Sequence, residues 1–445
     1  MRVLLLVDGE HYPPVTRWAI GVARERGFDP VAALLVGGLE KLDAGGGLDI
    51  GLPLERVELD GGTAGTGLRA AIAAHAPDAV LDLSDEPVLG YAERMELAAI
   101  TLAEGLPYLG PDFRLDPPIE GPPLGVPTVG VIGTGKRTGK TAIGGEVARV
   151  AHDLGLAPIV VAMGRGGPPE PQVAEAGSID PEALLELARG GHHAASDYLE
   201  DAATTGVTTI GARRAGGGLA GRPFVTNVRE AADLAVERGA GLVILEGSGA
   251  AIPPIPWDAG VLVASATMPP VYLGGYLGPF RLLLSDLVVF TMASSPRGLE
   301  NLSALRPLVR RHQADARYVV TDFIPVPLQD VRGRRAFFTT TAPAPAAAAQ
   351  VRHLEAEAGC RVVGWSARLA DRAGLREDLE AADDYDVLLT ELKAAAVDVG
   401  VSTALARGAE VVFVDNRATV VEGPTDLRTA LVEVLHLAVE RGSLR

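Results

Sequence analysis

The stretch GTGKRTGKT at residues 133–141 has the composition of a phosphate-binding loop. It joins a short apolar segment, VGVI, to a run with the pattern of a helix, GKTAIGGEVARVAHDLG. Glycines allow backbone N–H groups to wrap around phosphate oxygens, and the N-terminus of the following helix adds partial positive charge. In this pattern Lys140 reaches the terminal phosphates and Thr141 can bind Mg²⁺. The residues therefore predict a nucleoside triphosphate site, with ATP and Mg²⁺ as cofactors.

The loop departs by one position from the common G-x-x-x-x-G-K-[ST] spacing. Five residues before Gly139 stands Thr134, and the glycine comes one place earlier, at Gly133. This arrangement resembles the loop of dethiobiotin synthetase and its relatives, many of which activate carboxylates or phosphates on small molecules. Lys136 and Arg137 add two cations, which either contact phosphate or are solvated. The predicted nucleotide contacts are Gly133, Thr134, Gly135, Lys136, Arg137, Thr138, Gly139, Lys140 and Thr141.

A carboxylate for the metal ion is expected at the end of a neighbouring strand, because Mg²⁺ takes few protein ligands and keeps several waters. The segment LVILEGSGAAIPP at 242–254 supplies one, with Glu246 at the end of an apolar run and glycines beside it. The string E-G-x-G also resembles dethiobiotin synthetase-like enzymes. Thr141 and Glu246 are therefore the predicted metal ligands. The alternative is that Glu246 is only an acid in a turn.

Three segments between these two motifs are rich in cations and glycine: MGRGGPPEP, GGHHAASDYLEDA and IGARRAGGGLAGRPF. Loops of this kind gather beyond the carboxyl ends of parallel strands, where ligands bind. Arginine side chains match phosphate and carboxylate oxygens in pairs, so a small anionic phosphorylated substrate is the predicted partner. Each side chain could instead be solvated, and the adjacent histidines could contact phosphate, transfer protons, bind zinc or simply end a helix. The candidate substrate contacts are Arg165, His192, His193, Arg213, Arg214 and Arg222.

Polar residues also stand at predicted strand ends outside this central region. Asp8 and His11 follow the first strand, and Glu391 and Lys393 end a strand near the C-terminus. Such positions face ligands in parallel sheets, but they also cap helices and form turns. His11 and Lys393 are predicted to contact substrate.

Three successive series of strand-like and helix-like segments must position these residues. The alternation predicts parallel sheets covered by helices. The stretch LDPPIEGPPLGVP at 115–127 contains five prolines and is the clearest linker. We therefore predict an α/β protein with a central P-loop NTPase domain and a parallel sheet at 125–330. It is flanked by an N-terminal Rossmann-like domain at 1–124 and a C-terminal α/β domain of Rossmann-like βα units at 331–445.

Composition limits the classes of partner. The 445 residues carry a formal net charge of -17, whereas general binding to nucleic acid or anionic membranes needs a basic field, so neither is a predicted partner. Cys360 is the only cysteine, which excludes a disulfide framework and a cysteine-rich metal site within one chain. The sequence has neither a signal-peptide pattern at its start nor an uninterrupted apolar run of about 18 residues. A soluble cytoplasmic protein is expected, and a homodimer stays open.

Six motifs follow one another along the chain: DGEHYPPV at 8–15, LSDEPVLGY at 83–91, VIGTGKRTGKTAIGGEVAR at 131–149, MGRGGPPEP at 163–171, LEGSGAAIPP at 245–254 and TELKAAAVDV at 390–399. Their order resembles the cyclic 2,3-diphosphoglycerate synthetase family. The resemblance implies ATP-driven closure of an intramolecular phosphoanhydride between the two phosphates of 2,3-diphosphoglycerate, with release of ADP and phosphate and a requirement for Mg²⁺. The phosphate loop alone fits many families, whereas this order is more specific.

The predicted mechanism starts with in-line attack of one substrate phosphate on the γ-phosphorus of ATP, after which the second substrate phosphate closes the ring. Positioning and charge neutralisation would dominate, because phosphates are already ionised near neutral pH. The predicted catalytic residues are Lys140, Lys136, Arg165 and Glu246. Two other functions stay open: a kinase or acid-activating ligase acting on another phosphorylated or carboxylic acid, and a P-loop NTPase switch or metallochaperone. Such switches often carry a lysine where this chain has Gly135, which counts against the second.

Overall fold

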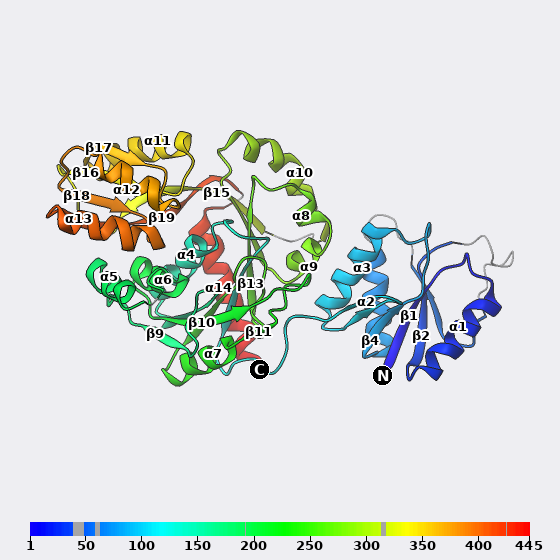
Figure 1. Cartoon of the computed structure of the whole chain (residues 1–445). Helices are drawn as coiled ribbons and strands as arrows, with labels where there is room; N and C mark the ends of the chain where they lie inside the picture. Colours follow the sequence, from blue (N-terminus) through cyan, green and yellow to red (C-terminus); the bar gives the residue numbers. More distant parts are fainter. Residues whose placement is uncertain (39–48, 58–62, 192, 313–316, 424) are drawn as a thin grey trace.

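The computed structural model describes residues 1–38, 49–57, 63–191, 193–312, 317–423 and 425–445 (Figure 1). Within these residues the strands form two sheets, one of six strands near the N-terminus and one of thirteen strands in the remainder of the chain. Most neighbouring strands are parallel and are connected by helices. The predicted α/β fold, with a central P-loop domain between two further βα units, is confirmed.

The N-terminal sheet has the order β3-β2-β1-β4-β5-β6 and is parallel except for β6. Its central strand β1 has the sequence RVLLLV, which is apolar almost throughout because helices cover both faces of a parallel sheet. Helix α3 packs against α9 of the central domain. The elements are β1 (Arg2–Val7), α1 (Pro13–Glu25), β2 (Asp29–Leu35), β3 (Leu54–Arg56), α2 (Thr63–His75), β4 (Ala79–Asp82), α3 (Tyr91–Ala103), β5 (Tyr108–Leu109) and β6 (Arg114–Leu115).

The large sheet begins with a parallel series in the order β10-β8-β12-β7-β13-β14-β15, and the short strands β9 and β11 pair antiparallel with β10. Strand β7, which leads into the phosphate loop, lies between β12 and β13. The strands are β7 (Thr128–Gly133), β8 (Pro158–Gly164), β9 (Gln172–Ala174), β10 (Thr209–Ala215), β11 (Val225–Thr226), β12 (Leu242–Glu246), β13 (Ala259–Ser265), β14 (Leu287–Thr291) and β15 (Arg317–Pro327).

Helix α4 starts immediately after the phosphate loop and covers one face of this sheet. Its buried side chains Ile143, Val147 and Val150 recur at the spacing of one helical face. The helices of the central domain are α4 (Lys140–Asp153), α5 (Pro181–Arg189), α6 (Asp197–Thr205), α7 (Val228–Glu237), α8 (Val271–Gly274), α9 (Gly278–Leu283) and α10 (Pro296–His312).

Strand β19 joins the C-terminal unit to the central sheet. Its first residues pair in parallel with β18, and its remaining residues pair antiparallel with β15. The two regions therefore share one continuous sheet. The remaining elements are β16 (Arg335–Thr339), α11 (Ala344–His353), β17 (Arg361–Ser366), α12 (Arg372–Glu380), β18 (Val387–Thr390), α13 (Ser402–Ala406), β19 (Glu410–Glu422), α14 (Leu427–Ser443) and the π-helical turns Leu354–Ala358 and Ala396–Val401.

The last helix, α14, returns to the central domain. Figure 1 shows it in red beside β13 and α4, and its buried side chains Leu431, Val434 and Leu435 join the core that contains Val131 and Val263. The part of the chain described by the structure contains no helix with the length and apolar character needed to cross a membrane.

Candidate active site

The phosphate loop is closed around the side chain of Lys140. Its Nζ donates a hydrogen bond to the carbonyl oxygen of Gly135 at 2.8 Å. Gly139 adopts a left-handed φ of +85°, and a Cβ there would lie 2.4 Å from the ring of Phe323, so glycine is required on both counts. Across the sheet, Thr291 Oγ1 donates to the carbonyl of Thr138 at 2.7 Å and fixes the end of the loop.

The environment of Lys140 is unusual for an ammonium group. Burial lowers its pKa to about 8, although the nearby carboxylates Glu246 and Asp197 act in the opposite direction. The only hydrogen bond of this ammonium within the described residues goes to Gly135, so further donors remain for a ligand. A partly buried cation at the N-terminus of a helix is suited to phosphate oxygens.

Glu246 is the last residue of β12, the strand beside β7. Its side chain lies over the first turns of α4, where a Cβ on Gly144 would come within 1.7 Å of Glu246 Oε1. The glycine therefore makes room for the carboxylate. Burial, together with the negative charge of Asp197, raises the pKa of Glu246 to about 8. Thr141, in the first turn of the same helix α4, is the second predicted metal ligand.

Cationic side chains meet beside this carboxylate at Gly249. A Cβ on Gly249 would lie 3.5 Å from Lys136 Cγ and 3.6 Å from an Nη2 atom of both Arg165 and Arg214. Arg214 is buried and donates from Nη2 to the carbonyl of Ser248 at 2.8 Å. Burial and the charge of Arg165 lower the pKa of Arg214. Three cations, two from loops and one from the end of β10, thus converge.

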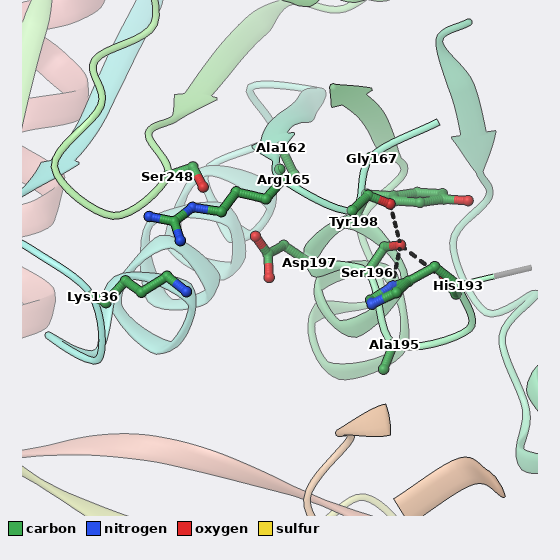
Figure 2. Close-up of a pocket in the computed structure, with 12 residues that line it drawn as sticks. Lys136, Ala162, Arg165, Gly167, His193, Ala195, Ser196, Asp197, Tyr198 and Ser248 are labelled. Atoms are coloured by element: carbon green, nitrogen blue, oxygen red, sulfur yellow. Dashed lines mark hydrogen bonds between the residues drawn. The ribbon is translucent and has the colours of Figure 1, made fainter. Parts of the chain in front are cut away.

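A cavity of about 240 Å³ opens between these cations and the start of α6. In Figure 2 the side chains of Lys136, Arg165 and Asp197 point into the same space, and Ser248 borders it. The cavity is large enough for a small, highly charged molecule. Its position next to the phosphate loop is the one expected for an acceptor.

His193 lies at the far wall of this cavity. Its Nδ1 is 3.0 Å from Ser196 Oγ, which also donates to the carbonyl of Gly166 at 3.1 Å (Figure 2). A second cavity of about 430 Å³ lies behind it and is lined in part by Arg213, whose Nε donates to the carbonyl of Gly167. His192 falls outside the described residues.

Four predicted substrate contacts do not line these two cavities: Arg214, described above, and Arg222, His11 and Lys393. Arg222 is paired with the exposed side chain of Glu120, with Nη2 and Oε2 2.6 Å apart. His11 lies in the N-terminal unit, where Nδ1 is 2.8 Å from Oδ1 of the buried Asp8. These side chains have partners in the fold that account for their positions, and a role in binding substrate stays a prediction for both.

Lys393 is likewise held by a protein partner. Its Nζ lies 2.6 and 2.7 Å from the two carboxylate oxygens of Glu200 on α6. Burial raises the pKa of Glu200, and the charge of Lys393 opposes this effect. The ion pair connects the C-terminal TELKAAAVDV segment to the helix that borders the acceptor cavity.

Helix α6 contributes acidic residues that were not predicted. Asp197 lines the cavity, and Asp201, one turn further on, is buried against the same region. The spacing of two acids by four residues was visible in SDYLEDA, and it puts both on one face of a helix. Within the described residues, no group of three or more His, Cys, Asp or Glu side chains surrounds one point. A magnesium ion needs no such group, because it binds one or two carboxylates and takes waters and phosphates as its other ligands.

Comparison with known proteins assigns the chain to a family. Three domain models match it in order: the cyclic 2,3-diphosphoglycerate synthetase N-terminal domain at residues 2–116, P-loop domain at 128–321 and C-terminal domain at 327–417. A solved structure of a duf1611 family protein from Anabaena variabilis covers 83% of this chain and 95% of its own, with 12% identity and a TM-score of 0.18. That score is too low to support an argument.

Curated relatives cover almost the whole chain. A protein of Rubrobacter xylanophilus named cyclic 2,3-diphosphoglycerate synthetase is 47% identical over 94% of both chains. Proteins with the same name from Methanothermobacter thermautotrophicus and Methanothermus fervidus are 40% and 39% identical over 100% and 99% of this chain and 98% of their own. These relatives confirm the predicted resemblance and show that the chain is an enzyme. The chain belongs to the cyclic 2,3-diphosphoglycerate synthetase family.

Proposed function

We propose that this enzyme uses ATP and Mg²⁺ to close a phosphoanhydride ring between the two phosphates of 2,3-diphosphoglycerate, releasing ADP and inorganic phosphate. The names of its relatives support the product. The observation that carries the proposal is the convergence of Lys136, Arg165 and Arg214 on Gly249, beside the phosphate loop. A cluster of three cations suits a compact acceptor that bears several negative charges.

The nucleotide side of the site consists of the loop 133–141 and the start of α4. Lys140 would neutralise the terminal phosphates, and backbone N–H groups of the glycine-rich loop would hold their oxygens. Thr141 and Glu246 would hold Mg²⁺, which when bound offsets charge on the β- and γ-phosphates. The unpartnered Oε1 of Glu246 supports this fit, since a buried carboxylate oxygen requires a cation or a donor.

Two displacements account for the reaction. In the first, one phosphate of the acceptor attacks the γ-phosphorus of ATP, a bond to that phosphorus forms, and ADP leaves. In the second, the other acceptor phosphate attacks the phosphorus of the first acceptor phosphate, to which the γ-phosphoryl group is now bound. The ring closes, and the transferred group leaves as inorganic phosphate. Arg165, Arg214 and Lys136 would hold the two phosphates against their mutual repulsion, so alignment supplies much of the rate enhancement.

A panel of acceptors tests this assignment. ADP release should be stimulated strongly by 2,3-diphosphoglycerate and much less by monophosphorylated or dicarboxylic acids of similar size. Stimulation by another acid alone would point to a kinase or acid-activating ligase. Hydrolysis that no small acid stimulates, but that a partner protein does, would point to a P-loop switch instead.

A further inference from the structure

Two buried carboxyl groups, Glu246 at the end of β12 and Asp201 on α6, face each other, and the described residues offer them no hydrogen-bond donor other than a proton that the two groups share. Asp201 is 1% exposed, and neither of its carboxylate oxygens has a hydrogen-bond partner among the residues that the structure describes. Glu246 is 4% exposed, and the same holds for its Oε1. Buried polar atoms in folded proteins are almost always satisfied, so two carboxyl groups that have only each other either share a proton or bind a cation.

Glycines in α4 bring the two carboxylates together. Glu246 lies directly over Gly144. Helix α6 packs on the next residue, because a Cβ on Gly145 would lie 3.2 Å from Thr205 Cγ2. Asp201 is one turn before Thr205 and therefore on the same face of α6. The face of α6 that carries Asp201 is thus directed at the first turns of α4 and the end of β12.

The surrounding cations offset the charge of this pair only in part. Lys140 is the nearest ammonium on the nucleotide side, and its hydrogen bond goes to the carbonyl of Gly135. Lys393 is occupied by both oxygens of Glu200, the residue next to Asp201. Asp197, one turn earlier on α6, adds more negative charge. The region therefore gathers several carboxyl groups away from solvent, an arrangement that is unfavourable for their charged forms unless a cation is bound.

We propose that Asp201 is a ligand of a divalent cation together with Glu246, so that α6 contributes directly to the metal site. Magnesium and manganese fit this chemistry, since they prefer oxygen ligands and complete their shells with waters and phosphate oxygens. The inference rests on the proposed function, in which the metal accompanies the nucleotide. It adds a ligand that the P-loop motif does not contain, and it gives the Lys393–Glu200 pair a positioning role, because that pair holds the turn of α6 on which Asp201 stands.

Binding of Mn²⁺ to the full-length protein tests the proposal without measuring turnover. Titration followed by electron paramagnetic resonance, with and without ADP, should give a dissociation constant for the wild type that rises at least about tenfold in Asp201→Asn. Glu186→Gln, which removes an exposed carboxylate from the neighbouring helix α5, should leave it unchanged. Equal affinity of the wild type and Asp201→Asn would overturn the proposal, as would a wild type that binds no Mn²⁺.

Thermal unfolding distinguishes loss of the ligand from loss of the fold. Asp201→Asn should unfold at a higher temperature than the wild type in EDTA, because an unpaired buried charge is removed, and should lose most of the stabilisation that Mn²⁺ gives the wild type. A lower melting temperature in EDTA, combined with a preserved response to Mn²⁺, would mean that Asp201 is only structural. If Mn²⁺ binding depends on Asp201 but the product is not cyclic, the proposed function fails and the metal site stands.

Discussion

The hydrogen-bond partners of the charged residues in the site indicate which of them can bind a ligand. Lys140 Nζ donates to a backbone carbonyl, and the nearby acidic side chains favour its charged form. The ammonium group can therefore bind phosphate. Arg214 is fixed by Ser248, whereas Arg165 is exposed at the cavity and keeps its donors available. The nucleotide side and the acceptor side therefore depend on different residues. Substitutions should separate them.

Lys140→Ala should lower kcat by roughly 10²–10³-fold or more, because a preorganised charge is lost where negative charge develops. The protein should remain folded, since this side chain makes a single hydrogen bond to the loop. Steady-state ADP release and circular dichroism measure the two effects. ATP-dependent product formation at the wild-type rate would rule out the assigned role of the lysine.

Arg165→Ala should raise the KM for 2,3-diphosphoglycerate by about 10- to 100-fold, the loss expected for a charge-assisted contact to phosphate. The KM for ATP should change little. Arg229→Ala, which removes an arginine from α7 that is paired with Asp233, is the matched control and should leave both constants unchanged. An increase confined to the KM for ATP would show that Arg165 contacts the nucleotide and not the acceptor.

Helix α4 contains glycines where other parts of the site pack closely against it. Its N-terminus supplies Lys140 and Thr141, and its glycines Gly144 and Gly145 leave space for Glu246 and for helix α6. Glycine weakens a helix interior by roughly 0.5–1 kcal/mol relative to alanine. The two glycines therefore cost the helix some stability, but they leave the space that the site needs.

Gly144→Ala should reduce kcat by roughly 10- to 100-fold while changing the free energy of unfolding by less than about 1 kcal/mol. The new methyl group would overlap the tip of the flexible Glu246 side chain, so the carboxylate moves and the helix survives. Gly21→Ala in α1 is the control, because a Cβ there meets no atom within 4 Å. It should add about 0.5–1 kcal/mol of stability in urea unfolding and leave kcat unchanged. Wild-type kcat in Gly144→Ala would contradict the role given to Glu246.

The local elements of the site could be predicted from sequence, but its assembly could not. The strand–loop–helix around 133–141 follows from adjacent residues, and E-G-x-G marks the neighbouring strand end. The acids Asp197 and Asp201 gain their significance only when α6 packs on α4, a contact between segments far apart in the chain. Strand β19 is a second example. The polar run DNR at 415–417 interrupts its apolar sequence, yet the strand continues to Glu422 because β15 supplies its backbone partners.

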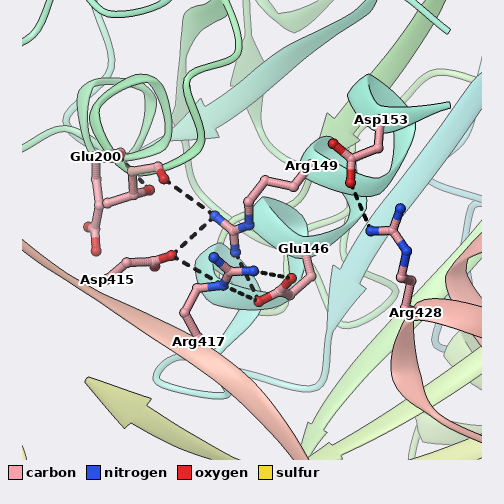
Figure 3. A network of polar contacts seen from close by, with 8 residues as sticks. Glu146, Arg149, Asp153, Glu200, Asp415, Arg417 and Arg428 are labelled. Carbon is pink, nitrogen blue, oxygen red and sulfur yellow. Dashed lines mark hydrogen bonds and ion pairs between the residues drawn. The ribbon is translucent and has the colours of Figure 1, made fainter. Parts of the chain in front are cut away.

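At the scale of the whole molecule, polar contacts tie the C-terminal elements to the helix that follows the phosphate loop. Figure 3 shows Glu146 and Arg149 of α4 facing Asp415 and Arg417 of β19. Arg417 Nε lies 2.7 Å from Glu146 Oε1, and Arg149 Nη1 lies 3.1 Å from Asp415 Oδ2. Burial raises the pKa of Glu146, but the hydrogen bond from Arg417 and the charge of Arg149 outweigh it, so the pKa is lowered.

Arg417→Ala should lower the free energy of unfolding by about 1–3 kcal/mol at pH 7, because Glu146 loses its main hydrogen bond in a buried position. A carboxylate with a lowered folded-state pKa stabilises above its unfolded pKa, near 4.3, and loses that contribution as the pH falls through the folded value. The difference between variant and wild type should therefore narrow below about pH 4.5. Urea unfolding across this pH range measures it.

Arg428→Ala is the comparison for that experiment. Arg428 pairs with Asp153 on the same helix, but both side chains are at least half exposed, so the loss should stay below about 1 kcal/mol. Equal losses for the two variants, or a difference that does not depend on pH, would contradict the assignment of Glu146.

The phosphorus NMR spectrum of the products formed from ATP, Mg²⁺ and 2,3-diphosphoglycerate tests the central claim most directly. The account predicts resonances of ADP and inorganic phosphate in equal amounts, together with a pyrophosphate-type signal from a cyclic product that grows at the same rate. Lys140→Ala should give none of these signals. A spectrum with ADP and a linear phosphorylated acceptor, or with ADP and phosphate while 2,3-diphosphoglycerate is unchanged, would contradict it.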